Sequence, residues 1–255
     1  MDWIIETSGL SRRFDGFLAV DELNLQVRRG CFYGFLGPNG AGKSTTIKML
    51  TGLLAPTSGS IRVLGRDLAD QQEALEVKRR TGVVPENLSL FDNLTAREYL
   101  TFIGRMYSLP RDTVRKRTDE LLNLMSLDRE EKKLTMEFSH GMKKKLALAA
   151  ALLPDPELLF LDEPFEGVDA VASRVLRDLL KRCVERGATV FLTSHVLEIV
   201  ERLCTDVAII VKGKLVCQET MEQLRAAGAG SLEERFLNVV GTDESATQKL
   251  SWLEG

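Results

Sequence analysis

The chain has 255 residues, of which 44% are hydrophobic and 28% are charged, so its length suffices for one large domain or two small ones with a substantial core. The formal net charge of −3 argues against general binding of DNA or RNA, and no nucleic-acid partner is expected. No apolar run approaches the roughly 20 residues of a membrane-spanning helix, and the start of the chain lacks the pattern of a signal peptide. Four scattered cysteines favour a reducing compartment, so the sequence predicts a cytoplasmic protein.

Short apolar segments separated by glycine and aspartate open the chain, at residues 3–6, 18–20 and 23–27. This pattern predicts an antiparallel β-meander, and we assign residues 1–36 to a mostly antiparallel β-subdomain. Its last segment, residues 31–36, is an apolar aromatic run typical of a buried strand. Phe14 lies beside two arginines and a turn, and its residue type alone indicates a core position.

A glycine-rich loop follows that strand. Its sequence, GPNGAGKST over residues 37–45, fits the P-loop pattern, and the segment after it predicts the helix that the pattern requires. In such a loop the glycines let successive backbone N–H groups turn toward phosphates, and the helix N-terminus adds positive partial charge. Lys43 would reach the β- and γ-phosphates of a nucleotide, and the hydroxyl of Ser44 would bind Mg²⁺. The sequence therefore predicts a nucleoside-triphosphate site.

The remaining sequence predicts an α/β core that is interrupted by helices. Residues 37–90 and 154–220 are assigned to a nucleotide-binding core, whereas residues 91–153 carry no strand pattern and are predicted to form a helical subdomain. There Thr95 and Glu98 have the spacing of a capping box, and the last helix is predicted to begin at Ser139. The basic run of residues 143–145 at its start is interpreted as a solvated face rather than a nucleic-acid patch. Residues 221–255 are predicted to form a helical tail.

Two predicted buried strands end in polar residues. Residues 157–161 are followed by Asp162 and Glu163, and residues 189–193 lead to His195. Ligands of open α/β sheets bind at the carboxyl ends of the strands, so these side chains are expected near the phosphates. Asp162 would hold Mg²⁺, Glu163 would polarise the attacking water, and His195 would donate to the γ-phosphate. A surface acid and a structural histidine are the alternative interpretations.

Over nearly its whole length the chain resembles the nucleotide-binding subunits of ATP-binding-cassette (ABC) transporters. Residues 37–45 resemble the Walker A motif of that family, and residues 158–163 resemble Walker B with its catalytic glutamate. Residues 138–142 are similar to the signature motif, residues 166–169 to the D-loop and residues 193–195 to the switch-histidine motif. The resemblance implies an α/β P-loop NTPase fold, with a RecA-like core built on a parallel sheet. The N-terminal antiparallel β-subdomain and the inserted α-helical subdomain would complete one ATPase domain over residues 1–240.

The resemblance also implies a role for individual residues. The catalytic residues would be Glu163, His195 and Lys43. The Mg²⁺ ligands would be Ser44, Glu86 and Asp162, where Glu86 stands at the Q-loop position that usually holds glutamine. Phe14 would stack on adenine, in place of the core position indicated above. The complete set of ATP-binding residues would be Phe14, Val20, Gly37, Pro38, Asn39, Gly40, Ala41, Gly42, Lys43, Ser44 and Thr45, joined from a second subunit by Ser139, Gly141 and Asp169.

The chain departs from the family pattern in the signature motif, where His140 and Met142 replace a glycine and a glutamine, and in residues 165–169 of the D-loop. Because Ser139, Gly141 and the helix N-terminus remain, phosphate capture should remain as well.

In this family two cassettes sandwich two Mg-ATP molecules. The resemblance therefore implies a second cassette, identical or paralogous, and a separate transmembrane permease, with the chain bound peripherally to the inner face of the cell membrane. It is most similar to the multidrug or polysaccharide exporter branch, so export is expected rather than import. Two alternatives stay open at this point: a soluble ABC ATPase acting on nucleic acid or the ribosome, and a P-loop kinase of small substrates.

Overall fold

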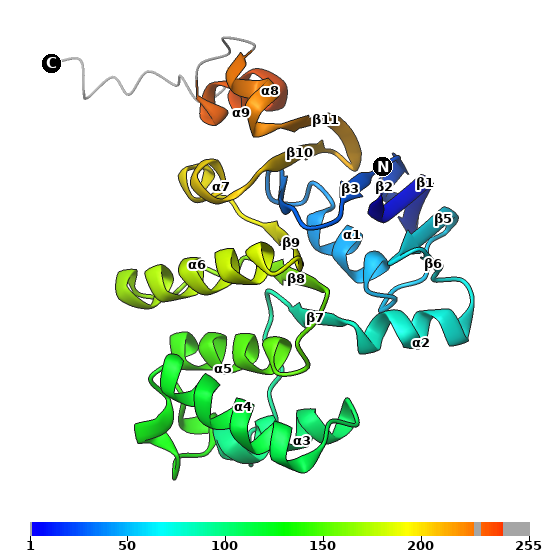
Figure 1. The fold of residues 1–255 in the computed structure, drawn as a ribbon. Helices are drawn as coiled ribbons and strands as arrows, with labels where there is room; N and C mark the ends of the chain where they lie inside the picture. The colour runs from blue at the N-terminus through cyan, green and yellow to red at the C-terminus, as the bar shows by residue number, and fades with distance from the viewer. Residues whose placement is uncertain (1, 227–230, 242–255) are drawn as a thin grey trace, which may run out of the picture.

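The computed structural model describes residues 2–226 and 231–241, which form two β-sheets and a group of helices (Figure 1). The tail predicted beyond residue 241 lies outside the described residues. Within the described residues no helix is both long and apolar enough to cross a membrane.

A six-stranded sheet forms the centre of the molecule, in the order β11-β10-β4-β9-β8-β7. Neighbouring strands are parallel except for β11, which forms an antiparallel hairpin with β10. The strands are β4 (Phe32–Leu36), β7 (Thr81–Val84), β8 (Leu158–Asp162), β9 (Thr189–Thr193), β10 (Asp206–Val211) and β11 (Lys214–Thr220). Every residue of β4, β8 and β9 is buried, as expected for parallel strands that are covered on both faces.

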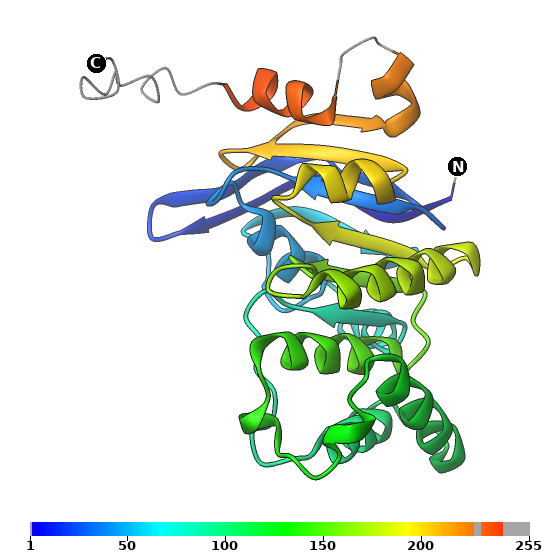
Figure 2. The ribbon, with the colours of Figure 1, turned by 90° about the vertical axis from the view of Figure 1, so that its left-hand side faces the viewer.

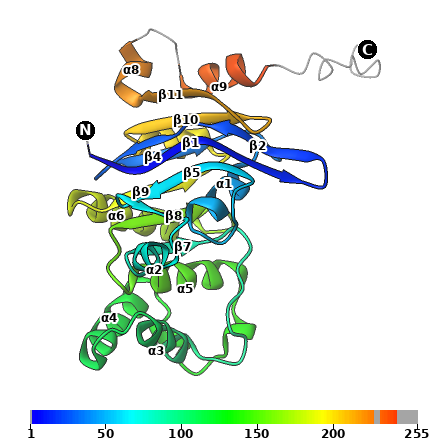
Figure 3. The same cartoon turned by 90° about the vertical axis from the view of Figure 1, so that its right-hand side faces the viewer.

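An antiparallel sheet covers one face of this core, as Figure 3 shows. It consists of β1 (Trp3–Phe14), β2 (Phe17–Leu23), β3 (Gln26–Arg28), β5 (Ser58–Val63) and β6 (Arg66–Asp67). The boundary predicted at residue 36 is wrong in both directions. Strand β4 lies before that boundary but belongs to the parallel sheet, whereas β5 and β6 lie beyond it and join the antiparallel sheet through β1.

Side chains of β4 alternate between two hydrophobic cores, one on each face of the parallel sheet. Tyr33 and Phe35 pack toward the antiparallel sheet, in a cluster that includes Ile4 and Ile5 of β1. Phe32 and Leu36 pack into the other cluster, which contains residues of the helices α5 (His140–Leu152), α6 (Ala170–Glu185) and α7 (Leu197–Leu203). This alternation follows from the two-residue period of a strand.

Helices connect the strands and pack against both cores. They are α1 (Lys43–Leu50), α2 (Gln71–Arg79), α6 (Ala170–Glu185), α7 (Leu197–Leu203), α8 (Met221–Ala226) and α9 (Leu232–Val240). The short helix α7 follows His195 and was not predicted. Its residues Val200 and Leu203 are buried, and such a short apolar run has no helical period that the sequence could show.

The helical subdomain lies beside β7, the edge strand of the parallel sheet (Figure 2). It contains α3 (Ala96–Met106), α4 (Arg111–Leu124), the 3-10 turns η1 (Asp128–Glu130) and η2 (Thr135–Glu137), and α5 (His140–Leu152). The capping box predicted for Thr95 and Glu98 is confirmed. Ser139 caps α5 by accepting a hydrogen bond from the Met142 N–H. The solvated face predicted for the basic run is wrong for Lys144, which is 3% exposed.

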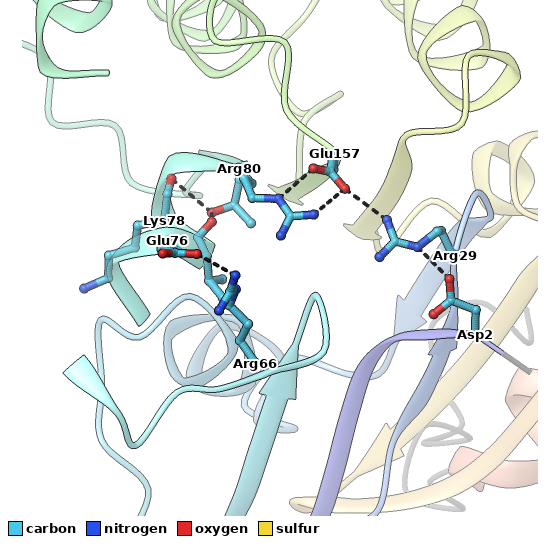
Figure 4. A network of polar contacts seen from close by, with 9 residues as sticks. Asp2, Arg29, Arg66, Glu76, Lys78, Arg80 and Glu157 are labelled. Carbon is cyan, nitrogen blue, oxygen red and sulfur yellow. Dashed lines mark hydrogen bonds and ion pairs between the residues drawn. The ribbon is translucent and has the colours of Figure 1, made fainter. Parts of the chain in front are cut away.

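Ion pairs join the two sheets at the amino ends of the parallel strands (Figure 4). Glu157 accepts hydrogen bonds from Arg80 at 2.6 and 2.8 Å and from Arg29 at 3.0 Å, and Arg29 also pairs with Asp2. The hydrogen bonds with Arg80, and then those with Arg29, hold the pKa of the Glu157 carboxyl below its ordinary value. This network lies at the opposite end of β8 from Asp162, the last residue of that strand.

Candidate functional site

The P-loop, residues 37–45, connects the buried strand β4 to helix α1 (Figure 1). Two of its glycines are required by close approaches of neighbouring backbone. A Cβ on Gly37 would lie 2.3 Å from the carbonyl oxygen of Ile210, and a Cβ on Gly42 would lie 2.5 Å from that of Ala19. Gly42 also has a φ of 106°, in the left-handed region that favours glycine. The shape of the loop therefore requires glycine at both positions.

The side chain of Lys43, the first residue of α1, is hydrogen-bonded to the start of the P-loop. Its Nζ donates hydrogen bonds to the carbonyl oxygens of Gly37, at 2.8 Å, and Pro38, at 3.1 Å. Burial lowers the pKa of this ammonium, and the negative charges of Glu163, Asp162 and Glu86 oppose that shift. A buried cation surrounded by three carboxylates and held only by backbone carbonyls is well placed to bind the oxygens of a polyphosphate.

A cavity of about 330 Å³ opens beside the loop. It brings together nine of the residues that the sequence assigns to ATP, Mg²⁺ and catalysis, with Phe17 and Ala19 in addition. Its lining consists of Phe17, Ala19, Asn39, Gly40, Gly42, Lys43, Ser44, Thr45, Glu86, Asp162 and Glu163. Among the other candidates, Val20 and Ala41 are buried, and Pro38 accepts the Ala41 N–H.

Asp162 and Glu163 reach this cavity because β8 and β9 are adjacent parallel strands in register, with Asp162 beside Thr193. The hydroxyl of Thr193 donates to Oδ1 of Asp162 at 2.5 Å and accepts from the N–H of Glu163 at 3.1 Å. Thr193 was not predicted as a site residue. The sequence signal that could have found it is its place at the carboxyl end of a strand next to the one that carries Asp162.

Glu163 adopts a left-handed backbone conformation, with φ of 49°, which is uncommon for a residue other than glycine and is typical of functional sites. Its Oε2 lies 3.0 Å from Nδ1 of His195 and accepts the backbone N–H of that residue at 3.3 Å. Burial raises the pKa of the Glu163 carboxyl, and the His195 charge is the largest effect in the opposite direction. The side chain of His195 itself is 56% exposed. A carboxyl with a raised pKa beside an imidazole suits proton transfer.

The candidate metal ligands all line the same cavity. The hydroxyl of Ser44 donates to Oε2 of Glu86 at 3.4 Å, and Asp162 lines the cavity with them. Hydroxyl and carboxylate oxygens are the hard ligands that Mg²⁺ prefers. Among the described residues, however, no three histidine, cysteine or carboxylate side chains gather closely enough to hold a metal without other ligands. These residues fit a magnesium ion that takes its remaining ligands from phosphate and water.

The aromatic residue that lines the cavity is Phe17 rather than Phe14. The two residues are paired across the β1–β2 hairpin, so their side chains emerge on one face. The guanidinium of Arg12 lies 4.5 Å from the centre of the Phe14 ring, whereas the ring of Phe17 is 64% exposed. Stacking of Phe14 on adenine thus stays a prediction, with Phe17 as the competing residue.

Ser139, Gly141 and Asp169 do not line the P-loop cavity. They lie together at the first turns of α5 and α6. Ser139 caps α5, and Asp169 caps α6 by accepting the N–H of Ala172 at 2.9 Å. A Cβ on Gly141 would lie 3.2 Å from the carbonyl oxygen of Gly167. The structure therefore brings Gly141 of the signature motif close to Gly167 of the D-loop, and it places Ser139, Gly141 and Asp169 outside the cavity that contains Lys43.

A glycine-rich loop that can surround a phosphate, placed between a buried parallel strand and a helix and close to carboxylates at the end of a nearby strand, defines a P-loop nucleotide-binding protein. The ABC transporter family profile matches residues 20–166. The chain therefore belongs to the ABC transporter family, and it is an ATP-binding and ATP-hydrolysing subunit of that family.

Individual relatives agree with this assignment. The chain is 40% identical to the bacitracin transport ATP-binding protein BcrA of Bacillus licheniformis over 234 residues, which cover 91% of the chain and 75% of BcrA. It is 38% identical to the daunorubicin/doxorubicin resistance ATP-binding protein DrrA of Streptomyces peucetius, over 88% of the chain and 67% of DrrA. It is 35% identical to the probable multidrug ABC transporter ATP-binding protein YbhF of Escherichia coli, but spans only 42% of that protein.

The solved structures confirm the fold. The structure of an ATP-binding subunit of an ABC transporter has a TM-score of 0.87 and 32% identity, and covers 93% of the chain and all of its own length. The cbiO1 protein of Clostridium perfringens has a TM-score of 0.76 and 28% identity, and covers 93% of the chain. The predicted P-loop NTPase fold with a parallel core sheet is thus confirmed.

Proposed function

We propose that the chain binds Mg-ATP in the P-loop cavity and hydrolyses it with Glu163 as the general base. The observation that carries this proposal is the position of the Glu163 carboxyl, which lines the same cavity as Lys43 and is bonded to His195. Bound phosphate would take over the hydrogen bonds that Lys43 gives to the loop carbonyls. Glu163, whose pKa is raised by burial, would accept a proton from the attacking water.

His195 has two tasks in this proposal. Its Nδ1 holds the Glu163 carboxylate in place, and its second ring nitrogen, on an exposed side chain, is left to interact with the γ-phosphate. Ser44, Glu86 and Asp162 would hold Mg²⁺, which when bound neutralises charge on the phosphates. Phe17 or Phe14 would stack on the adenine ring.

The nucleotide site would be completed by a second cassette. Ser139, Gly141 and Asp169 lie outside the P-loop cavity of their own chain, at the exposed N-terminal turns of α5 and α6, where backbone N–H groups favour an anion. We infer that they face the ATP of a second copy or of a paralogue, so that binding of two nucleotides closes the pair.

A separate transmembrane permease would receive the resulting motion. The segment between β7 and α3 carries the exposed aromatic ring of Phe91, which packs edge-on against Phe102 with ring centres 5.1 Å apart. Both residues are partly exposed, at 54% and 38%, and Phe91 lies five positions after the proposed Mg²⁺ ligand Glu86. An apolar surface of this kind suits a protein partner. We propose that the permease docks there and holds the chain at the cytoplasmic face of the cell membrane.

Export is the proposed direction of transport. The relatives described above are named for bacitracin transport and for daunorubicin and doxorubicin resistance, and a Nod factor export protein of Ralstonia nicotianae is 36% identical over 87% of the chain. These names all favour a transporter over a cassette that acts on nucleic acid. The cargo itself would be selected by the permease.

Glu163→Gln tests the proposed chemistry. The amide cannot accept the proton, so the variant should bind ATP with unchanged affinity and lose ATP hydrolysis. Glu120→Gln, which neutralises an exposed carboxylate of α4 that does not line the cavity, is the matched control and should retain turnover. Full turnover in Glu163→Gln would overturn the assignment of the general base.

A further inference from the structure

A second cavity, distinct from the P-loop cavity, lies between α4, α5 and α6, which are stacked one above another in Figure 1. Its volume is about 90 Å³. The lining is mostly apolar, with Leu148 of α5, Val175 and Leu176 of α6 and Leu124 of α4 among its residues. At the rim the side chain of Val171 is 76% exposed and that of Leu124 is 41% exposed, which leaves an entrance from solvent.

Lys144 lines this cavity and has no partner in it. The residue is 3% exposed, and its Nζ is buried without a hydrogen bond from any described residue. Four carboxylates act on its charge, Glu166 most strongly, followed by Glu163, Asp162 and Glu86, but none of them forms an ion pair with it in the part of the chain that the structure describes. Desolvation lowers its pKa, as expected for an unpaired buried ammonium.

An isolated buried ammonium is costly because it loses its hydration and gains no counter-ion. Water alone would match this cavity poorly, because ten of its fourteen lining residues are apolar and only Ser126, Lys144, Lys145 and Asp169 have polar side chains. A ligand with one negative charge and a small apolar body would satisfy both the ammonium and the apolar wall.

We propose that this cavity is a binding site for a short-chain carboxylate, with the carboxylate on Lys144 and the hydrocarbon between α4, α5 and α6. The carboxylate and the ammonium would form a charge-assisted hydrogen bond in a low-dielectric surrounding. An apolar cavity of about 150 Å³ is known to admit benzene, so the smaller volume here suits a carboxylate of about four carbons in total.

The site lies where an occupant would act on the rest of the cassette. Helix α5 begins directly after Ser139 and α6 directly after Asp169, and the cavity is lined by residues from both helices and by Asp169 itself. A bound carboxylate therefore bridges the helices whose first turns carry the signature and D-loop residues.

Butyrate is the probe that tests this inference. The full chain, labelled with ¹³C at the methyl groups of leucine and valine, is titrated with sodium butyrate without nucleotide, while sodium chloride keeps the ionic strength constant. We expect the methyl signals of Leu148, Val171 and Val175 to shift to saturation. Acetate, which lacks the apolar body, and butyramide, which lacks the charge, should bind at least tenfold more weakly. Because no nucleotide is present, this result is independent of the proposed ATPase mechanism.

Two variants test the contributions of the Lys144 charge and of the cavity volume to butyrate binding separately. Lys144→Met removes the ammonium and keeps the length of the side chain, and should weaken butyrate binding at least tenfold. Ala172→Phe keeps Lys144 but fills the cavity, and should also abolish the shifts. Lys143→Met, a change at a neighbouring lysine that does not line the cavity, is the matched control and should bind butyrate as the unaltered chain does. Equal binding of butyrate and butyramide, binding retained in Lys144→Met, or no saturable shift at all would overturn the inference.

Discussion

Nδ1 of His195 lies 3.0 Å from Oε2 of Glu163, although the two residues follow different strands and are separated by 32 positions in the sequence. The contact depends on the pairing of β8 with β9, which places Asp162 beside Thr193. The imidazole and the carboxyl therefore form one pair at the carboxyl ends of the parallel strands. Replacement of either residue should reduce ATP hydrolysis, but to a different extent.

Replacement of His195 by alanine should reduce ATP hydrolysis but leave ATP binding intact, because the imidazole positions Glu163 and does not hold the bulk of the phosphate charge. The expected loss in kcat is about 10²-fold, at the lower end of the range for general acid–base help, and the loss in Glu163→Gln should be larger. Steady-state kinetics with a nucleotide-binding measurement would check both. A rise in KM with unchanged kcat would contradict the positioning role.

Thr193→Val should damage the site while preserving the shape of the strand. The variant removes the hydroxyl that donates to Asp162 and accepts from the Glu163 N–H, and leaves a buried N–H unpaired at a cost of about 1–3 kcal/mol. We expect both a lower melting temperature and a lower kcat. Thr193→Ser, which keeps the hydroxyl, should retain most of the activity. Wild-type stability in Thr193→Val would show that the hydroxyl is dispensable.

Glu86→Gln should retain ATPase activity, because an amide oxygen can bind Mg²⁺ as a carboxylate oxygen can. The native carboxylate adds a negative charge beside Asp162 and Glu163, so activity of the unaltered chain should depend tightly on Mg²⁺, and this dependence should relax in the variant. Titration of ATPase activity with MgCl₂ measures the difference. Loss of turnover in Glu86→Gln would mean that the negative charge itself is needed.

The two aromatic residues of the β1–β2 hairpin are expected to contribute unequally to ATP binding. Phe17 lines the P-loop cavity, whereas Phe14 is covered by the guanidinium of Arg12. Stacking of a base on an aromatic ring contributes about 1–3 kcal/mol, so Phe17→Ala should weaken ATP binding about tenfold, and Phe14→Ala should have a smaller effect. Phe17→Tyr is the conservative control. A larger effect of Phe14→Ala would restore the role that the family resemblance gives to that residue.

The ion pairs of Glu157 should make the stability of the fold depend on pH. The pKa of the Glu157 carboxyl is lowered in the folded chain, chiefly by Arg80. The charged carboxylate therefore stabilises the fold above the ordinary glutamate pKa, and this stabilisation is lost as the pH falls through the lowered pKa. Because the side chains are more than a third exposed, we expect at most about 1 kcal/mol. Glu157→Gln should therefore lower the melting temperature at pH 7, and the difference from the unaltered chain should shrink below about pH 4. A difference that does not change with pH would exclude the ion pairs as its cause.

Most of the P-loop site could be predicted from the sequence because its chemistry is local. Residues 37–45 are contiguous, and Asp162 and Glu163 directly follow an apolar run, so the strand and its polar end are recognisable without knowledge of the fold. The same holds for the caps at Thr95 and Ser139, whose partners lie three residues away.

Features that depend on distant contacts could not be predicted. Strands β5 and β6 join the antiparallel sheet only because β1 continues far enough to pair with β5, and no local pattern in residues 58–67 reports this. The environment of Lys144 depends on three helices from separate segments. In the sequence it is the middle member of a basic run, which by local pattern belongs on a solvated surface.

In the proposed mechanism one chain supplies two half-sites that become complete only across a subunit boundary. Lys43→Ala destroys the P-loop half-site and Ser139→Arg destroys the signature half-site, so each variant alone should lack ATPase activity. A dimer formed from one copy of each contains one intact pairing, the P-loop of the Ser139→Arg chain with the signature of the Lys43→Ala chain. ATPase activity should therefore return when the two inactive variants are mixed. A mixture that stays inactive, although the two chains demonstrably associate, would contradict the shared site.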